Sequence, residues 1–398
     1  AARRKLILGR GRAKKLPAGE PFLGGWYTEQ EIRATVRTIR KSMDWHVGFG
    51  FMVKEIADFE TAFARYCGTR HAVSVATASI GLDLAMRCLD LKQGDEVICP
   101  AVNFKASHLA VLGQGGSLVF CEIDPRTLNL DPRDVERRIT RRTRAILPVH
   151  MNGLAAPMNA LLRIARRYSR AGREPIRVIG DAARACGGGA EGAKIGKKGW
   201  MTVFSFHTMK LMTTLGEGGM VTTDSPSVAA RLRRIIQWGG DREWGSSYKL
   251  TRVQAAVGLV QLRRLDAMIA RRVRLARRRS ALLAGAPELT LPSAPPGFAH
   301  TYYLYTLLVP RAWAGKRRDA VVRVLRERYG VACAICNPPT YQGSAFIRAR
   351  TPGQRLPLSE EIGARLFCPS IHPLMTDEQN EYIAAAVIES VERVRKTA

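Results

Sequence analysis

Lys210 lies in the stretch VFSFHTMKLMTTLGEGG, between a short apolar run that ends near Ser205 and a glycine-rich turn. A lysine in apolar surroundings is unfavourable unless its amine is neutral or covalently bonded, and a lowered pKa makes the amine a nucleophile toward carbonyl groups. The alternative is a lysine whose long side chain reaches the surface. Lys210 is therefore a candidate for a covalent bond to an aldehyde.

Asp181 follows directly on another apolar run, in VIGDAARACGGG. A partly desolvated carboxylate at that place stays ionised only if a cation or a strong hydrogen-bond donor faces it. The alternative is that Asp181 caps the turn that follows.

Residues that suit a ligand also follow two further apolar runs. In VSVATASIGLDLAM, Thr77 and Ser79 begin a helical pattern, and the free N–H groups of a helix start bind anions; such residues also cap many helices for local reasons alone. In CPAVNFKASHLAV, Phe104 offers an aromatic face that can cover a flat ring, or it belongs to the core.

Taken together, these features comprise an anion-binding helix start, a carboxylate, an aromatic ring and a reactive lysine. Pyridoxal phosphate requires this set: an imine to lysine, a carboxylate on the pyridinium nitrogen, a stacking ring and phosphate donors. The combination predicts a pyridoxal phosphate site, and no cluster of residues predicts a metal site.

Short apolar runs alternate with helical patterns through the middle of the chain. The runs at 71–76, 96–100, 117–124, 145–150, 176–181 and 201–206 read as strands. Such alternation predicts an α/β fold with a mostly parallel sheet covered by helices on both faces. In sheets of this kind ligands bind at the carboxyl ends of the strands, where the candidate residues lie.

Three segments are expected along the chain. Residues 1–20 are basic and poor in apolar residues, which predicts a mobile arm. Residues 21–262 form the large α/β domain, which begins with helices at 28–43 and 52–68, the first opened by a capping box of Thr28 and Glu31. Residues 263–398 form a smaller α+β domain.

The 398 residues include 63 Lys and Arg against 34 Asp and Glu, which gives a formal net charge of +29. Basic runs such as RRVRLARRR, 271–279, suit polyanions, but arginine is spread along the whole chain with few aromatic residues beside it. We expect a solvated basic surface rather than specific nucleic-acid binding. No apolar run approaches the roughly 18 residues of a membrane span, and no signal peptide is evident, so the sequence predicts a cytoplasmic protein.

The eight cysteines are mostly scattered singly in apolar segments, as reduced, buried thiols are. Cys333 and Cys336 form a lone CxxC without a second pair or neighbouring histidines, which favours a structural role over zinc or redox chemistry.

From about residue 23 to its end, the chain resembles the DegT-type family of pyridoxal phosphate enzymes of fold type I. The motifs that carry the resemblance are GDEVICPAVNF, EIDPRTLNLDP, TRAILPVHMNG, IGDAARACGG, FSFHTMKLMTTLGEGGMVTT and VQAAVGLVQLRRLD. The family aminates keto-sugars and cyclitols in antibiotic, lipopolysaccharide and cell-surface glycan pathways. The resemblance implies a large, mostly parallel seven-stranded sheet domain and a smaller C-terminal domain.

The resemblance also implies residue roles. Lys210 corresponds to the Schiff-base lysine, Asp181 to the partner of the pyridinium nitrogen, Phe104 to the stacking aromatic residue and Ser205 to a phosphate-binding serine.

At several positions the chain departs from the family pattern. Ala78 and Ser79 replace the usual Gly-Thr that holds the phosphate, and an alanine suits a backbone contact if its φ is negative. Arg184 stands where glutamine or histidine is common, which changes the contact to the 3′ oxygen of the cofactor or to the substrate carboxylate. Lys249 replaces an Asn or Arg that reaches the phosphate of the neighbouring subunit, and its cation suits a phosphate.

The implied reaction is transamination from Glu or Gln to a keto-sugar, often nucleotide-linked, or to a keto-cyclitol, by a homodimer with shared active sites. One alternative is the dehydratase branch of the family, in which a histidine replaces the lysine, so Lys210 speaks against it. The other is a DNA-binding regulator built on the same fold. Regulators of that kind carry a helix-turn-helix domain ahead of the fold, for which the first 20 residues are too few.

Overall fold

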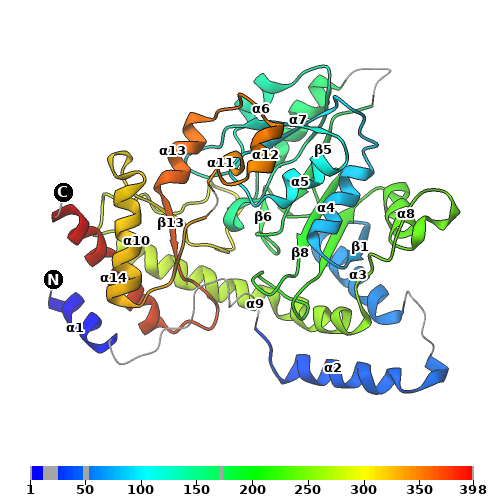
Figure 1. Ribbon diagram of the computed structural model, residues 1–398. Coiled ribbons are helices and arrows are strands. Elements are labelled where there is room, and N and C mark those ends of the chain that lie inside the picture. The colour runs from blue at the N-terminus through cyan, green and yellow to red at the C-terminus, as the bar shows by residue number, and fades with distance from the viewer. Residues whose placement is uncertain (1, 12–25, 48–52, 170–173, 337, 397–398) are drawn as a thin grey trace.

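The computed structural model describes residues 2–11, 26–47, 53–169, 174–336 and 338–396 (Figure 1). Its centre is a seven-stranded sheet in the order β1-β9-β8-β5-β4-β2-β3. The strands are β1 His71–Val75, β2 Glu96–Pro100, β3 Ser117–Cys121, β4 Thr143–Ile146, β5 Arg177–Asp181, β8 Met201–Ser205 and β9 Gly219–Thr223. All neighbours pair in parallel except β9, which is antiparallel to β1 and β8. The predicted α/β fold is confirmed, and β9 is the strand that the apolar runs did not indicate.

Helices cover both faces of the sheet, as predicted. Successive side chains of a strand point to opposite faces. In β2, Val97 and Cys99 join the core beneath α4 and α5, whereas Ile98 joins the core beneath α6 and α7. The helices of the large part are α3 Lys54–Cys67, α4 Ala78–Arg87, α5 Ala106–Gly113, α6 Pro132–Arg138, α7 Met158–Tyr168 and α8 Pro226–Ile235. Short β6 Gly189–Ala190, β7 Ala193–Lys194 and β10 Phe298–Ala299 form a separate ribbon.

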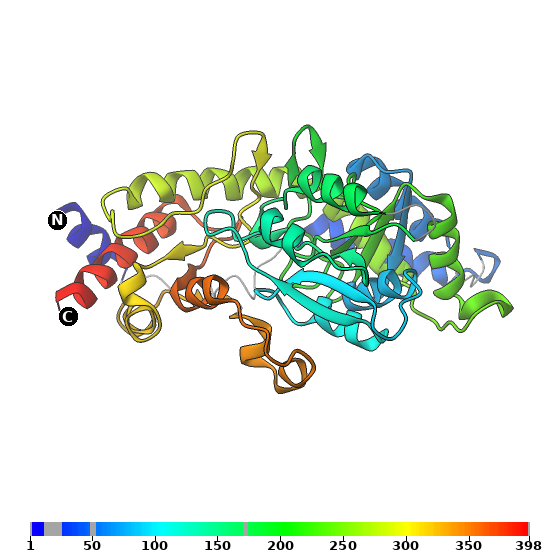
Figure 2. The ribbon, with the colours of Figure 1, turned by 90° about the horizontal axis from the view of Figure 1, so that it is seen from above.

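Helix α9, Arg252–Leu283, runs unbroken for 32 residues, which is about 48 Å at 1.5 Å per residue (Figure 2). Its first half packs against α3 and against α2 Glu29–Ser42, and its second half packs against α14 Asp377–Lys396. The capping box of Thr28 and Glu31 at the start of α2 is present as predicted. Because α9 passes through residue 262 without a break, it contributes to both parts of the chain, and the division there stays a prediction.

The C-terminal part is α+β, with a three-stranded antiparallel sheet in the order β11-β13-β12. Its elements are β11 Leu307–Leu308, α10 Lys316–Tyr329, β12 Cys333–Ala334, α11 Thr340–Gly343, α12 Ala345–Arg350, α13 Pro357–Arg365, β13 Leu366–Pro369 and α14 Asp377–Lys396. Short 3-10 turns occur at Trp45–Val47, Met151–Gly153, Trp238–Asp241 and Arg311–Trp313.

The N-terminal arm differs from the expectation of a mobile segment. Residues 2–11 form helix α1, Ala2–Gly11, which lies beside α14 in both views (Figures 1 and 2). Ile7 and Leu8 pack against the C-terminal core, and Arg4 Nη1 lies 2.6 Å from Glu392 Oε1. The two apolar side chains give the basic arm a face to bury. Residues 12–20 lie outside the described residues.

The basic run 271–279 is not wholly solvated as expected. Arg272 and Arg279 are 1% and 0% exposed, because positions seven apart share one helix face and this face of α9 points into the core. Arg272 Nη1 donates to Ile371 O at 3.0 Å, and Arg279 Nε donates to Asn380 Oδ1 at 2.8 Å. Part of the positive charge thus stabilises loop and helix-terminus groups inside the C-terminal part.

Residues 338–359 belong to the C-terminal part by sequence but are fixed to the large sheet. Tyr341, Ile347 and Leu356 are buried in the core beneath α4 and α5. At the edge strand β3, Gln354 Oε1 accepts from Phe120 N and Gln354 Nε2 donates to Leu118 O, both at 2.8 Å. This attachment holds the preceding chain, residues 334–336, over the carboxyl ends of the strands.

Replacing Gln354 with alanine removes both bonds to β3. An unpaired backbone group costs about 1–3 kcal/mol, so local opening of residues 338–359 should rise roughly tenfold. We expect trypsin to cut the native Gln354→Ala protein after Arg348 or Arg350 correspondingly faster than the parent, as followed by mass spectrometry. Gln342→Ala, in the same segment but with an exposed side chain, should leave the rate unchanged. Equal rates for all three proteins would contradict the anchoring role of Gln354.

Candidate active site

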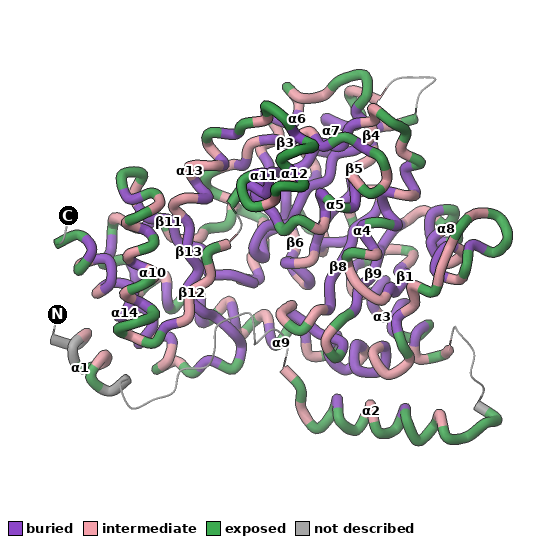
Figure 3. The backbone as a smooth tube through the Cα atoms, viewed as in Figure 1, coloured by how far each residue is buried: buried purple, intermediate pink, exposed green. Residues whose placement is uncertain are grey.

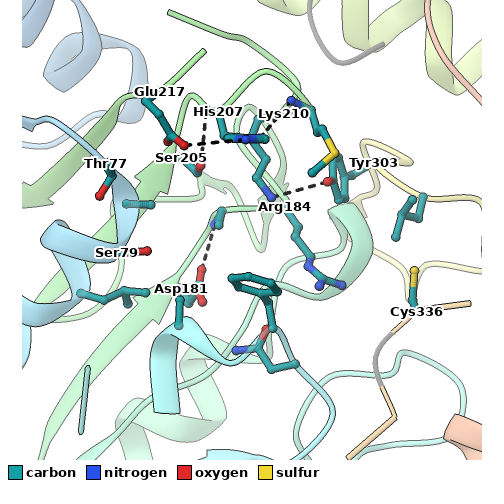
Figure 4. A pocket seen from close by; sticks show the side chains of 18 of the residues that line it. Thr77, Ser79, Asp181, Arg184, Ser205, His207, Lys210, Glu217, Tyr303 and Cys336 are labelled. Atoms are coloured by element: carbon teal, nitrogen blue, oxygen red, sulfur yellow. Dashed lines mark hydrogen bonds and ion pairs between the residues drawn. The ribbon is translucent and has the colours of Figure 1, made fainter. Parts of the chain in front are cut away.

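A cavity of about 510 Å³ opens at the carboxyl ends of the strands (Figure 4). Its walls come from the segments that follow β1, β2, β5 and β8, and from the C-terminal segments around Tyr303 and Cys336. It brings together seven of the predicted site residues: Ala78, Ser79, Phe104, Asp181, Arg184, Ser205 and Lys210.

Lys210 follows β8 in the loop that leads to β9. This loop turns at Gly216, whose φ of +110° suits glycine. Lys210 Nζ lies 3.5 Å from the hydroxyl oxygen of Tyr303, as the dashed line in Figure 4 marks. Burial and the positive charge of Arg184 lower the pKa of Lys210 to about 8. The amine is therefore easier to deprotonate than an ordinary lysine, as a nucleophile requires.

Asp181 ends β5 and is 5% exposed. Its Oδ2 accepts a hydrogen bond from Ser107 Oγ at 2.5 Å, and its Oδ1 accepts one from Ala183 N at 3.0 Å. Asn103 Nδ2 donates to Ser107 Oγ at 2.9 Å and so extends the chain of donors. The sequence analysis required a cation or strong donor facing this carboxylate, and Ser107 and Ala183 N supply hydrogen-bond donors there.

The start of α4 supplies the anion-binding end of the cavity. Thr77 caps the helix by accepting from Ile80 N at 3.1 Å, which leaves Ala78 and Ser79 in the first turn. Ala78 has no positive φ, so the alanine is compatible with this backbone. A Cβ at Gly219 would lie 2.8 Å from Ala78 N, so this glycine lets β9 approach the helix start. Ser205 lines the same cavity from the end of β8.

Phe104 is 58% exposed at the cavity, in the segment between β2 and α5. The alternative that it is a core phenylalanine is therefore wrong. An exposed ring at this place can cover a flat ligand.

Arg184 is buried in the cavity wall and donates from Nη1 to Asn152 Oδ1 at 3.0 Å. Asn152 is held in turn by Thr306, because its Nδ2 donates to Thr306 Oγ1 at 2.9 Å. The guanidinium is thus positioned by one residue of the large part and one of the C-terminal part.

Lys249 does not line the cavity. Its Nζ lies 4.0 Å from the centre of the Trp238 ring, in the segment before α9. Within a single chain, Lys249 is therefore apart from the other predicted site residues.

Sequence reasoning missed several side chains of the cavity wall: Tyr303, His207, Glu217 and Cys336. His207 Nε2 and Glu217 Oε1 lie 3.8 Å apart, an ion pair when the histidine is protonated. Cys336 was assigned only to a CxxC pair, and Tyr303 was not singled out. Both reach the cavity through tertiary packing, for which the local pattern gives no signal.

The donor set fits a phosphorylated aromatic aldehyde. The helix start and two serines suit an anion, and a hydrogen-bonded carboxylate suits a protonated ring nitrogen. An exposed aromatic ring suits a flat face, and a lysine with a lowered pKa suits a bond to an aldehyde carbon. No group of side chains suited to a metal ion occurs among the described residues.

Comparison with known proteins agrees with this site. The chain matches the model of the DegT/DnrJ/EryC1/StrS aminotransferase family over residues 27–388. A relative in Streptomyces venezuelae, dTDP-3-amino-3,4,6-trideoxy-alpha-D-glucose transaminase, is 34% identical over 381 residues, which cover 94% of this chain and 97% of that protein. GDP-perosamine synthase of Caulobacter vibrioides is 38% identical over 278 residues, 68% of this chain and 73% of that protein.

Among solved structures, S. venezuelae DesV in complex with a ketimine intermediate aligns with a TM-score of 0.85 and 34% identity, over 95% of this chain and 100% of that one. The fold and the site together define an aminotransferase of fold type I. Within that class, the chain belongs to the DegT/DnrJ/EryC1/StrS aminotransferase family, as the sequence motifs indicated. Its cofactor is pyridoxal 5′-phosphate.

Arg184 should control the proton affinity of Lys210. Arg184→Gln removes a cation that lowers the pKa of Lys210, so this pKa should rise from about 8 toward the ordinary value. The measurement is the pH dependence of Lys210 acylation in the cofactor-free protein, with the label located by mass spectrometry. Arg184→Lys keeps the charge and should keep the midpoint near that of the parent. A midpoint that is unchanged or lower in Arg184→Gln would refute this coupling.

Proposed function

We propose that this aminotransferase moves an amino group from Glu or Gln to a keto-sugar, through Lys210 as the residue that bonds to the cofactor. The observation that carries the proposal is the lysine with a lowered pKa, which shares one cavity with Asp181 and the start of α4. When bound, pyridoxal phosphate supplies an electron sink and a carrier for the amino group.

Each side chain of the cavity has a role in this proposal. Asp181 keeps the ring nitrogen protonated, and Ser107 and Ala183 N hold the carboxylate in place. Lys210, whose pKa is lowered to about 8, takes up and returns the proton at the reacting carbon, and the hydroxyl of Tyr303 lies 3.5 Å from its amine and can orient it.

The cavity also contains groups suited to the remaining parts of the ligands. The backbone N–H groups of Ala78 and Ser79, with the hydroxyls of Ser79 and Ser205, bind the phosphate. Phe104 covers the ring and excludes water from that face. The guanidinium of Arg184 receives an anionic group, either the 3′ oxygen of the cofactor or the carboxylate of the amino donor.

A nucleotide-linked keto-sugar is the acceptor that we favour over a free cyclitol. The names of the relatives from Caulobacter vibrioides and Streptomyces venezuelae both refer to amino sugars linked to a nucleoside diphosphate. The formal net charge of +29 suits a substrate with a diphosphate. A dehydratase is disfavoured because that reaction is associated with histidine at the position of Lys210. The cytoplasmic location stays a prediction; among the described residues, no helix is long and apolar enough to cross a membrane.

Reduction with borohydride tests the assignment of Lys210. After the protein is loaded with pyridoxal phosphate and reduced, peptide mapping should find the cofactor on Lys210 because this amine is the one held in the cavity. Lys210→Ala should retain no label, whereas Lys105→Ala, which removes an exposed lysine next to Phe104, should label normally. A label on another lysine in the parent would overturn the assignment.

The donor and the acceptor are tested separately from the lysine. Loaded protein is mixed with Glu or with Gln, and the change in cofactor absorbance identifies the donor. The enzyme that has taken up the amino group is then mixed with nucleotide-linked keto-sugars or with free keto-cyclitols. The compound that restores the original cofactor absorbance is the acceptor.

The same proposal includes a homodimer in which Lys249 completes the site of the partner. Helix α2 packs against α9, and most of its residues are exposed (Figure 3). The exposed residues include an apolar stripe. The stripe consists of Ile32, Val36, Ile39 and, at the helix end, Met43. Such a stripe supports an interface with a second copy. A lysine outside the cavity of its own chain is compatible with a contact in trans.

Subunit mixing tests the trans contact. Lys210→Ala and Lys249→Ala proteins should each show strongly reduced turnover, but a hybrid of the two should recover activity. In the hybrid, one site carries both changes and the other site carries neither, provided that Lys249 acts on the partner. Contact within one chain predicts no recovery, because each site of the hybrid then has one defect. Hybrids purified with two different tags provide the measurement.

A further inference from the structure

Three cysteines lie close to the strand pair β12–β13, beside the active site. Ala334 pairs with Cys368 in the antiparallel register, so Cys336 lies just beyond this pair and Cys333 just before it. Cys336 lines the cavity together with Lys210, whereas Cys333 and Cys368 do not line it. Figure 4 shows the Cys336 side chain among those that line the cavity, on the side of Tyr303.

Cys336 and Cys368 form a close thiol pair. Their sulfur atoms are 3.6 Å apart, and Cys368 Sγ also lies 3.4 Å from Thr306 Oγ1. Cys368 is buried on β13, with 2% of its surface exposed. Cys333 Sγ lies instead 3.9 Å from Ala334 O. The geometry therefore selects Cys368, rather than the CxxC neighbour, as the partner of Cys336.

The charges around Cys336 favour its thiolate. The hydrogen bond from Cys368, followed by the positive charge of Arg184, lowers the pKa of the Cys336 thiol. Burial raises the pKa of Cys368, and it raises that of Cys333 to about 12. The structure describes all eight cysteines, and burial also raises the pKa of the remaining five: Cys67, Cys88, Cys99, Cys121 and Cys186.

We propose that Cys336 is a peroxide-reactive thiol in the active-site wall and that Cys368 resolves it by forming a reversible disulfide. The Cys336 sulfur attacks one oxygen of hydrogen peroxide, the O–O bond breaks, and the departing hydroxide takes a proton to become water. The Cys368 sulfur then displaces hydroxide from the oxidised Cys336 sulfur and loses its own proton, which releases a second water. Two thiols lose two electrons in total, and an external dithiol restores them by exchange.

Disulfide formation should reduce activity. The two sulfur atoms must approach from 3.6 Å to about 2.05 Å. Because Cys368 is fixed in β13, Cys336 moves toward that strand and away from the cavity. The oxidised pair also carries no negative charge beside Lys210 and Arg184. This consequence for activity, unlike the disulfide itself, rests on the proposed function.

Peptide mapping of the loaded enzyme tests the pair directly. After a brief treatment with hydrogen peroxide, non-reducing tryptic digestion should give a linked pair of peptides 329–348 and 366–393, and tandem mass spectrometry should locate the bond at Cys336 and Cys368. Dithiothreitol should remove the link. Cys333→Ser should retain it, and Cys368→Ser should instead give a dimedone adduct on Cys336. A bond that includes Cys333, or oxidation spread evenly over the cysteines, would overturn the proposal.

Alkylation and a kinetic measurement complete the test. In the untreated enzyme, iodoacetamide should label Cys336 about tenfold faster than any other cysteine, and Arg184→Gln should slow that labelling more than Arg184→Lys does. In the parent, peroxide should slow the reaction of the loaded enzyme with its amino donor several-fold and reversibly. If the disulfide forms but the rate of reaction with the amino donor does not change, the proposed inhibition is refuted. An enzyme that forms the linkage but accepts no amino donor would refute the proposed function and leave the thiol pair intact.

Discussion

The parallel pairing of β5 with β8 is the constraint on which the site depends. Asp181 lies opposite Val203 in this pairing, so the carboxylate that ends β5 and the serine that ends β8 emerge at the same edge of the sheet. The loop after β8 then brings Lys210 back over that edge. β9 closes the loop by pairing with β8, and Gly219 lets it lie against the start of α4. The phosphate-binding end and the reactive amine are thus fixed by backbone pairing.

Low polarity at this edge gives the residues their chemistry. Lys210 is partly buried beside Arg184, and both effects favour the neutral amine. Asp181 is buried as well, but it has two hydrogen-bond donors within 3.0 Å, Ser107 Oγ in α5 and Ala183 N after β5. The same cavity therefore holds a lysine with a lowered pKa and a hydrogen-bonded carboxylate.

Local sequence predicted the parts of the site that follow strands of the large sheet. Phe104 comes shortly after the apolar run at 96–100, and Asp181 ends the run at 176–181. Ser205 lies near the end of the run at 201–206, and Lys210 comes five residues after Ser205. Because ligands bind at the carboxyl ends of the strands in parallel sheets, these residues could be predicted to share one site. Tyr303 and Cys336 belong to a different class. They enter the cavity because the C-terminal part packs against the sheet, and no periodicity in the sequence indicates that contact.

Local sequence patterns also predicted only part of the fold. Alternating strands and helices and the capping box of α2 were readable from local patterns, but the attachment of residues 338–359 to β3 was not, because it depends on one glutamine that meets a strand more than 230 positions earlier. In the same way, the burial of Arg272 and Arg279 depends on which face of α9 meets the core. Charge alone suggested a fully solvated run.

The contact of Gln354 with β3 has a further consequence for the assembly of the sheet. β3 is an outer strand, and an outer strand exposes N–H and C=O groups that can template pairing with another chain. The side-chain amide of Gln354 reproduces the donor and acceptor pattern of a neighbouring strand at Phe120 and Leu118. One glutamine thus occupies two of the backbone groups through which β3 would otherwise pair with another strand.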